Sequence, residues 1–234
     1  AASSYVVDQL RRHYQIRPDR IDLNHAAVKI PAVSDPLRDQ WRRRVRGGFN
    51  VPDDAVVYLF AAHDARFTGI EPLLRACQRL SERNLHFTLL LAGENSYGAQ
   101  RLAEELRIRE KVRFIGTTNQ MIQLYCAADV TCVPTYFDAA NRVVLESLIM
   151  GIPAISTAYS GVGSWIVPES GPPRGRVVAD PDDTTALAQA MAELADSAQR
   201  QRCATATAGL ADQLSLTRHV DGLEEILHRV VASR

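Results

Sequence analysis

The sequence predicts an α/β protein built on a doubly wound parallel sheet, and three observations support this fold class. Short apolar runs recur from residue 55 onward, as expected for strands that are buried on both faces. These runs alternate with segments of about 10–14 residues that are typical of helices. The chain has 234 residues, 46% of them apolar, which is enough for a sizeable core in one large domain or one domain with an appendage.

Two helices are expected ahead of this alternation. The first covers 4–14 and follows Ser3 and Ser4, either of which can cap its first turn. A short strand candidate comes next, at 20–24. The second helix covers 36–48, carries five arginines and ends at a pair of glycines. Its basic face suits solvent or a further domain, and the alternative is contact with an anionic membrane surface.

The alternation itself supplies the remaining elements. The strand candidates, which share short apolar runs, are 56–62, 86–92, 112–115, 129–133, 153–156 and 175–179. The helix candidates are 70–83, 97–107, 119–127, 141–150, 182–196, 198–212 and 216–232. The segment 157–175 is rich in Gly, Ser and Pro and is predicted to be a loop. Ligands of such sheets bind outside the carboxyl ends of the strands, so the loops after the strands are the predicted site.

Composition excludes several classes of function. The 27 basic and 27 acidic residues give a formal net charge of zero, so bulk charge does not favour nucleic acid as a partner. The four cysteines lack C-x-x-C spacing, which predicts reduced thiols and no metal site. No signal peptide is visible in these residues and no apolar run approaches the ~18 residues that span a membrane, so a cytoplasmic location is expected. Neither a G-x-G-x-x-G fingerprint after the first long strand nor a P-loop is present.

The segment 129–157 carries the strongest functional signal. It is predicted to run from a strand through a loop, a helix and a Gly-x-Pro turn into another strand. Asn141 is the expected N-cap of the helix, whose N-terminus suits an anion. Asp138 in the loop and Glu146 in the helix place two carboxylates near that anion, which suits the hydroxyls of a nucleotide-sugar. The alternatives are turn or cap chemistry for Asp138 and an exposed salt bridge for Glu146.

Two other loops are expected to contribute to phosphate and backbone contacts. Arg66 follows the first long strand, and its planar, permanently charged guanidinium suits phosphate oxygens. The alternative is an ordinary surface arginine. Gly93 ends the next strand and permits close approach of a ligand to the backbone. Glu94 and Asn95 beside it are alternatively caps of the following helix.

A third loop is expected to meet a nucleobase. It begins at Gly116 and Thr117, where backbone groups are free to pair with the edge of a base. Met121 then offers an apolar side chain to cover the base, although a methionine in a helix is more often part of the core.

Together these motifs resemble the C-terminal half of GT-B glycosyltransferases, in the large retaining group of bacterial lipopolysaccharide and polysaccharide glucosyl- and mannosyltransferases. The matching segments are 60–76, 89–93, 112–116, 124–130 with its Y-x-x-A-D-V-like signature, 134–153 with paired acids and the G-x-P turn, and 217–230. The resemblance covers roughly residues 4–230, and the combination of motifs is more specific than any one of them.

The resemblance implies a Rossmann-like domain that forms one half of a GT-B architecture. Residues 1–50 would be a linker helix and strand plus the basic helix, 51–214 the nucleotide-sugar-binding domain, and 215–234 a helix that crosses back to an N-terminal acceptor domain. That domain is expected to lie outside this sequence, so that the chain is a fragment, inactive alone. The enzyme would act in the cytoplasm or at the inner membrane surface.

The resemblance also assigns roles to residues. Glu146 would bind the ribose, Asp138 would hold hydroxyls of the donor sugar, and Arg66 would offset charge on the leaving diphosphate. The backbone contacts to sugar and diphosphate would come from Ala139, Ala140, Asn141, Arg142 and Val143. A UDP-sugar is the favoured donor and no metal is expected, although the residues alone do not identify the base, the sugar or the acceptor.

Three positions depart from the family pattern. Asp138 stands where the first acid is normally Glu, Thr68 replaces the usual Lys before Gly69, and Ala139-Ala140 replaces a Phe-Gly pair. The alternatives to a glycosyltransferase are therefore a nucleotide-sugar epimerase of the same fold and a degenerate, non-catalytic nucleotide-binding module.

Overall fold

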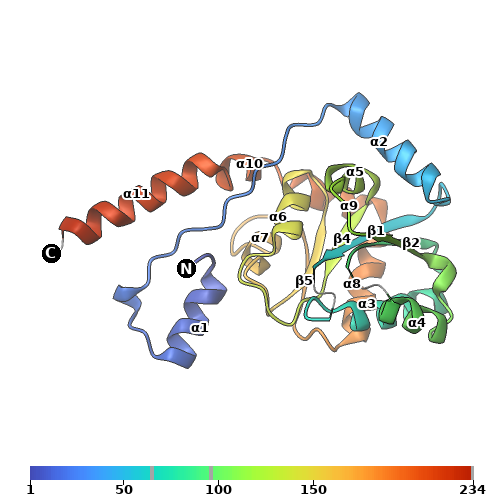
Figure 1. The fold of residues 1–234 in the computed structure, drawn as a ribbon, viewed down its shortest axis with the longest axis horizontal. Coiled ribbons are helices and arrows are strands. Elements are labelled where there is room, and N and C mark those ends of the chain that lie inside the picture. The colour runs from blue at the N-terminus through green and yellow to red at the C-terminus, as the bar shows by residue number, and fades with distance from the viewer. Residues whose placement is uncertain (64–65, 95–96, 233–234) are drawn as a thin grey trace.

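The computed structural model describes residues 1–63, 66–94 and 97–232, and its centre is a six-stranded parallel sheet (Figure 1). The strands are β1 (Val56–Ala62), β2 (Phe87–Gly93), β3 (Val112–Gly116), β4 (Val130–Val133), β5 (Ala154–Thr157) and β6 (Gly175–Val178). Their order across the sheet is β3-β2-β1-β4-β5-β6. The predicted doubly wound parallel sheet is confirmed, and each of these six strands lies within one residue of its predicted bounds.

The strand order creates a switch point between β1 and β4. From β1 the chain winds outward to β2 and β3 and then returns to place β4 on the other side of β1, where Tyr58 pairs with Val130 and Leu59 with Thr131. The connections on the two sides of this point diverge at the carboxyl edge of the sheet. Such a divergence leaves a crevice where ligands bind in doubly wound folds.

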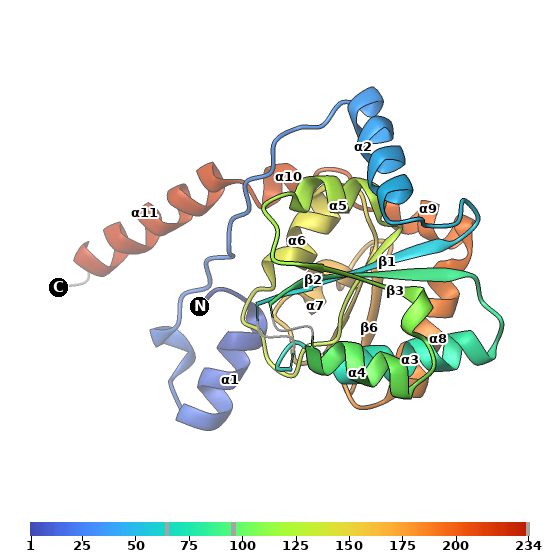
Figure 2. The same ribbon diagram turned by 45° about the vertical axis from the view of Figure 1, so that its right-hand side comes forward.

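Helices cover both faces of the sheet, which explains why the strands are almost entirely apolar (Figure 2). Tyr58 and Phe60 of β1 pack under α3 (Ile70–Glu82), α4 (Tyr97–Glu105) and α8 (Thr184–Ala195). Val57 and Leu59 alternate to the opposite face, where α2 (Asp35–Gly48) and α5 (Met121–Ala127) lie. On that face α6 (Arg142–Ile149) completes the layer beside β4 and β5.

Three local predictions are wrong. The segment 20–24 is a 3-10 turn (Pro18–Arg20) followed by extended backbone whose Asn24 N–H donates to the Ala1 carbonyl. The single helix predicted over 198–212 is two helices, α9 (Ser197–Thr205) and α10 (Leu210–Gln213), because Gly209 adopts a left-handed φ of 80° ahead of the second. The loop predicted over 157–175 contains a one-turn helix, α7 (Gly163–Ile166).

The segment 21–28 and the C-terminal helix lie side by side (Figures 1 and 2). Helix α11 (Leu216–Ala232) projects from the body, and the segment 21–28 after α1 (Ser4–Tyr14) runs along it (Figures 1 and 2). The Asn24 side-chain amide donates to the His219 carbonyl at 3.0 Å. Gly222 permits this approach, because a Cβ there would lie 3.2 Å from Asn24 Oδ1.

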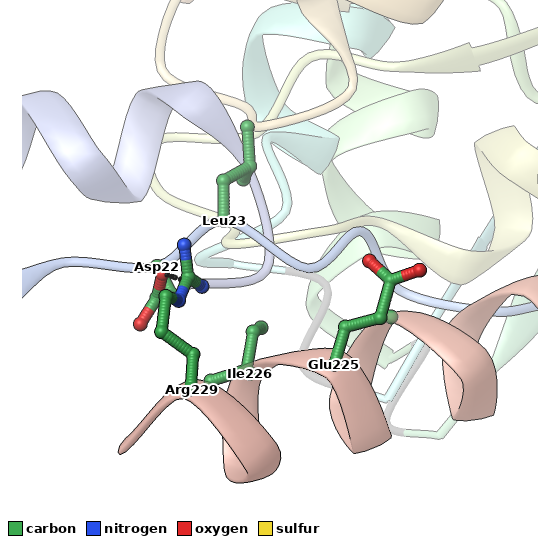
Figure 3. A pocket seen from close by; sticks show the side chains of 6 residues that line it. Asp22, Leu23, Glu225, Ile226 and Arg229 are labelled. Atoms are coloured by element: carbon green, nitrogen blue, oxygen red, sulfur yellow. Dashed lines mark hydrogen bonds and ion pairs between the residues drawn. The ribbon is translucent and has the colours of Figure 1, made fainter. Parts of the chain in front are cut away.

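An ion pair and a cavity extend this junction. Arg229 of α11 reaches back to the Asp22 carboxylate, and both residues line a cavity of about 450 Å³ between the segment and the helix (Figure 3). In the part of the chain that the structure describes, no helix combines the length and hydropathy needed to cross a membrane.

Candidate functional site

A small apolar cavity opens at the carboxyl edge of the sheet, on the predicted side. Its volume is about 160 Å³, and its lining residues are Ala61, Ala62, His63, Ala92, Gly93, Glu94, Thr117, Thr118, Met121 and Val143. Four residues predicted from the sequence, namely Gly93, Thr117, Met121 and Val143, are thus brought together. The volume is below the roughly 300–1,000 Å³ of pockets that enclose a whole drug-sized ligand, so this cavity suits one ring of a larger molecule.

Glycines allow the backbone to form this cavity. Gly93 has a φ of 135°, and a Cβ there would lie 1.9 Å from the Ala62 carbonyl oxygen of the neighbouring strand. Gly116, at the end of β3, has a φ of 74° and turns the chain toward Thr117. Met121, at the start of α5, lines the cavity and also packs against the core, so its core role is confirmed and its contact with a base stays a prediction. Asn95, proposed as a cap of the next helix, lies outside the described residues.

The turn before α6 is built by Asp138 and Asn141. Asn141 caps the helix as predicted, its Oδ1 accepting a hydrogen bond from Val144 N at 3.0 Å. The Asp138 carboxylate accepts from Ala140 N at 3.0 Å and from Asn141 Nδ2 at 2.7 Å. The turn chemistry considered as its alternative role is therefore present. Each carboxylate oxygen has a second lone pair, so the group retains capacity for a ligand hydroxyl.

The same turn is held from two further sides. Asp138 N donates to the Tyr159 carbonyl at 3.2 Å, and Gly161 N donates to the Asp138 carbonyl at 2.8 Å. From the N-terminal segment, the buried Ser3 hydroxyl donates to the Ala139 carbonyl at 2.7 Å. These contacts fix the backbone of the predicted donor loop before any ligand arrives.

Glu146 lies one turn further along α6 in a half-buried position, with its side chain 18% exposed. The hydroxyl of the fully buried Tyr125 donates to Glu146 Oε2 at 2.8 Å, and Arg142 Nη2 lies 3.5 Å from Oε1. Burial, followed by the charge of Glu146, raises the pKa of Tyr125, so this residue stays a hydrogen-bond donor. The salt bridge considered as the alternative role of Glu146 is present, but the carboxylate is not on an exposed face.

Tyr125→Phe is expected to lower the free energy of unfolding by about 1–3 kcal/mol, because it removes a partner from a half-buried carboxylate. Urea unfolding measures the change. Tyr14→Phe is the matched control, since Tyr14 is 73% exposed and should respond by less than about 0.5 kcal/mol. Equal stability of the Tyr125 variant and the wild type would show that the hydroxyl does not hold Glu146.

Arg66 lies on a neighbouring loop rather than in the turn itself. Gly69, with a φ of 83°, closes this loop, and a Cβ there would lie 2.0 Å from the Pro134 carbonyl oxygen. The Phe67 carbonyl accepts from Tyr136 N at 3.0 Å and from Thr135 Oγ1 at 3.2 Å. The loop of Arg66 is therefore fastened to the strand-end loop that leads into Asp138.

Val143 joins the two parts of the site. It follows the Asn141 cap in the first turn of α6 and also lines the apolar cavity. The cavity, the N-terminus of α6 and the loop of Arg66 thus share one edge of the sheet. The sequence did not assign functional roles to Tyr125, Ser3, Ala61 or Ala62. Their contributions depend on contacts across the fold. The sequence signals at Tyr125, which belongs to the Y-x-x-A-D-V-like signature, and at Ser3, a predicted helix cap, did not indicate these contacts.

Comparison with known proteins shows which family the chain matches. A family model described as glycosyl transferases group 1 matches residues 42–209. Lipopolysaccharide glucosyltransferase WaaG of Escherichia coli (strain K12) is 26% identical over 177 residues, which is 75% of this chain and 46% of that protein. The chain spans less than half the length of this relative.

Solved structures share the fold. The crystal structure of WaaG, a glycosyltransferase involved in lipopolysaccharide biosynthesis, superposes with a TM-score of 0.78 at 22% identity, covering 94% of this chain and 60% of that chain. Anabaena Alr3699/HepE in complex with UDP-glucose superposes with a TM-score of 0.69 at 19% identity, covering 91% of this chain and 58% of that chain.

Proposed function

The chain belongs to the group 1 glycosyl transferases, and from this premise we propose that it is the donor-binding domain of a retaining glycosyltransferase. The enzyme transfers a sugar from a nucleoside diphosphate, with UDP favoured, to an acceptor hydroxyl. One observation carries the proposal. Val143 lines the apolar cavity and also lies in the first turn of α6, directly after its capped N-terminus.

Each part of this edge suits one part of a nucleotide-sugar. The 160 Å³ cavity suits the base, with backbone groups at Gly116 and Thr117 within the same loop. The N-terminus of α6 suits the diphosphate, because unpaired N–H groups and the helix dipole favour an anion. Glu146 lies within two turns of that N-terminus and binds the ribose. Asp138 accepts hydrogen bonds from hydroxyls of the transferred sugar.

The proposed transfer breaks the bond between the anomeric carbon and the diphosphate oxygen, and the electron pair leaves with the diphosphate. The acceptor oxygen forms the new bond on the same face of the sugar, and its proton passes to the departing phosphate. Arg66 and the N-terminus of α6 offset the charge that develops on the leaving group. We therefore propose that transfer requires no metal ion.

The partners of this domain are part of the proposal. An acceptor domain of comparable size would complete the enzyme, which would act in the cytoplasm or at the inner membrane surface. The basic helix α2 supports membrane contact only weakly. Its Arg42 and Arg46 turn inward to Asp129, which leaves Arg43 and Arg44 among its exposed residues.

The proposal predicts that the chain binds UDP and that Glu146→Gln weakens binding about tenfold, or 1.4 kcal/mol, through loss of charge-assisted hydrogen bonds to ribose hydroxyls. Isothermal titration with UDP, GDP and ADP measures both effects. Glu193→Gln is the matched control, because Glu193 of α8 pairs with Arg176 of β6 and is not among the residues that line the cavity. Absence of binding by all three nucleotides, or equal UDP affinity of wild type and Glu146→Gln, would contradict the proposal.

A second candidate is a non-catalytic nucleotide-binding module. The engagement of both Asp138 carboxylate oxygens within the turn favours it, as do Thr68 and the Ala139-Ala140 pair. This candidate predicts that the complete protein binds a nucleotide-sugar without transferring or hydrolysing it. Product analysis on the complete protein separates it from the leading proposal.

A further inference from the structure

A second cavity opens at the amino edge of the sheet, opposite the proposed donor site. Its volume is about 280 Å³, and its lining includes Asp129 and Pro153, which directly precede β4 and β5. Parallel strands all begin at one edge of a sheet and end at the other, so this amino-edge cavity lies across the sheet from the loops that follow the strands. No residue among those that the structure describes lines both this cavity and the apolar cavity of the donor site.

The charged groups of the amino-edge cavity carry a positive excess. Those that line it are Arg38, Asp39 and Arg42 of α2, Asp129, and Arg200 of α9. Asp129 is divided between Arg42 and Arg46, whose Nη2 atoms each lie 2.7 Å from one of its oxygens. With Arg46 included, four arginines meet two aspartates. Such an excess favours an anion.

Arg38 and Arg200 carry the charge that is not balanced within the fold. Arg38 Nη1 donates to the Met150 carbonyl at 2.8 Å. Arg200 Nη1 donates to the carbonyls of Leu194 and Ala195 at 2.9 and 2.6 Å. Across residues 1–63, 66–94 and 97–232, neither guanidinium forms an ion pair or donates from Nε or Nη2. Both therefore retain donors for a ligand, because a guanidinium has N–H groups on every nitrogen.

The two guanidinium groups are held in place by the fold itself. Both residues are half-buried, and the carbonyls that anchor them belong to α8 and to the residue that ends α6. A planar guanidinium held in this way suits paired hydrogen bonds to phosphate oxygens. Ser197 and Gln201 of α9 also line the cavity and offer a hydroxyl and an amide. The cavity is smaller than the roughly 300–1,000 Å³ of pockets for drug-sized ligands, so it suits a phosphate group with a small organic part.

One carboxylate opposes anion binding. Asp39 lines the cavity, is exposed, and forms no ion pair with any described residue. Two further acids lie near it in the sequence of the same helices, Asp35 in α2 and Asp196 at the cap of α9. Neither of these lines the cavity, and neither do the exposed Arg43 and Arg202 of the same two helices. Asp39 is therefore the group whose removal should strengthen anion binding.

We propose that the amino-edge cavity binds a small, soluble phosphomonoester through Arg38 and Arg200. The phosphate oxygens accept hydrogen bonds from the Nε and Nη2 groups of the two arginines. Arg42 takes no part in binding, because its guanidinium is already engaged by Asp129 and by the carbonyls at 126–128. This site is additional to the proposed donor site and does not depend on it.

An NMR titration that follows the backbone amides of the intact chain tests this site. The probes are inorganic phosphate and glucose 6-phosphate at constant ionic strength, with glucose as the uncharged comparison. We expect the amide signal of Gly151, which lines the cavity, to shift saturably with a Kd in the millimolar range or below for both phosphates. Glucose should cause no shift. Absence of a shift with both phosphates would overturn the inference.

Arg38→Gln and Arg200→Gln should each weaken phosphate binding about tenfold, because each removes charge-assisted hydrogen bonds. Arg43→Gln is the matched control. It removes the same charge from the same helix as Arg38→Gln, but Arg43 is exposed and does not line the cavity. Unchanged melting temperatures confirm that the variants fold. Equal phosphate affinity in all three variants would show that the two arginines form no site.

Asp39→Asn keeps the test decisive if an arginine variant fails to fold. The exposed Asp39 side chain makes no hydrogen bond or ion pair with a described residue, so its replacement should leave the fold intact. Loss of its negative charge should tighten phosphate binding roughly twofold. Equal affinity of Asp39→Asn and the wild type would contradict binding in this cavity.

The phosphate titration is repeated with saturating UDP, because Tyr125 lines this cavity while its hydroxyl donates to Glu146. Unchanged phosphate affinity supports a separate site, whereas displacement by UDP would place the phosphate at the donor edge and overturn the inference. A chain that binds phosphate but not UDP would contradict only the proposed function. Sedimentation with vesicles of phosphatidylcholine and phosphatidic acid checks the source of the phosphate. Retention that is lost in Arg38→Gln would identify a lipid headgroup and overturn the soluble ligand.

Discussion

Asp129→Ala is expected to lower the free energy of unfolding by about 3–5 kcal/mol, because it leaves two arginines near the core without their counter-charge. The Asp129 carboxylate, 11% exposed, lies 2.7 Å from Arg42 Nη2 and 2.7 Å from Arg46 Nη2. It also accepts a hydrogen bond from Val57 N at 2.7 Å. The group therefore joins α2, the start of β4 and the central strand β1.

The contacts of Asp129 with Arg42, Arg46 and Val57 N form a clamp between α2 and the sheet. The pH dependence of stability provides an independent check on this clamp. Burial alone would raise the pKa of Asp129, but Arg42, Arg46 and the bond from Val57 outweigh burial and hold this pKa below its usual value. A depressed folded-state pKa contributes stability that is complete above the unfolded pKa, about 3.9, and is lost as the pH falls through the folded pKa. Asp129→Asn should remove this acid-sensitive component below about pH 4.

Urea unfolding at neutral pH and at acidic pH measures both effects. The matched control is Asp54→Ala, because Asp54 pairs with His86 on the surface, where both side chains are more than two-thirds exposed. Its expected change is below about 1 kcal/mol. An Asp129→Ala variant as stable as the Asp54 variant would contradict the role of the clamp.

Gly161→Ala is expected to destabilise the fold by about 3 kcal/mol and to weaken UDP binding at the same time, because no space exists for a side chain at this position. A Cβ on Gly161 would lie 1.9 Å from the Ala139 carbonyl oxygen and 2.2 Å from Ser3 Oγ. The added methyl group must displace either the loop before α6 or the N-terminal residue that bonds to it.

Thermal unfolding and isothermal titration with UDP measure the two consequences. Gly163→Ala is a close control, since a Cβ there meets nothing within 4 Å and the residue begins the short helix α7. Ser3→Ala removes only the hydroxyl and should cost about 1 kcal/mol. If Gly161→Ala matched Gly163→Ala in both measurements, the packing of the N-terminal segment on the donor loop would not matter.

The fold was predictable because its strongest signals are local. The four central strands of the parallel sheet are almost entirely buried, so they appear as short, mainly apolar runs, and the ends of all six strands were located to within one residue. Asn141 was predictable as a cap because its amide and the helix that follows are adjacent in the sequence. The break between α9 and α10 was missed because a single glycine interrupts an otherwise helical pattern, and such glycines are often tolerated within helices.

The site was only partly predictable because several of its contacts join distant residues. The bond between Ser3 and the Ala139 carbonyl spans 136 positions, and the bond between Tyr125 and Glu146 joins two helices. Asp129 appeared in the sequence only as part of a signature, whereas its role depends on arginines from α2. Spacing predicts which side chains share an edge of a sheet, but it does not predict which of them already bind one another.

The junction between segment 21–28 and α11 has a mechanical consequence. The Asn24 side chain donates a hydrogen bond to the His219 carbonyl of α11. Val28 N donates to the Leu214 carbonyl, just before the start of the helix. A load applied to α11 is thus shared with the beginning of the polypeptide and carried by Ser3 to the loop that precedes α6. The N-terminal segment and α11 are therefore coupled, so a rotation of α11 would shift the backbone at Ala139.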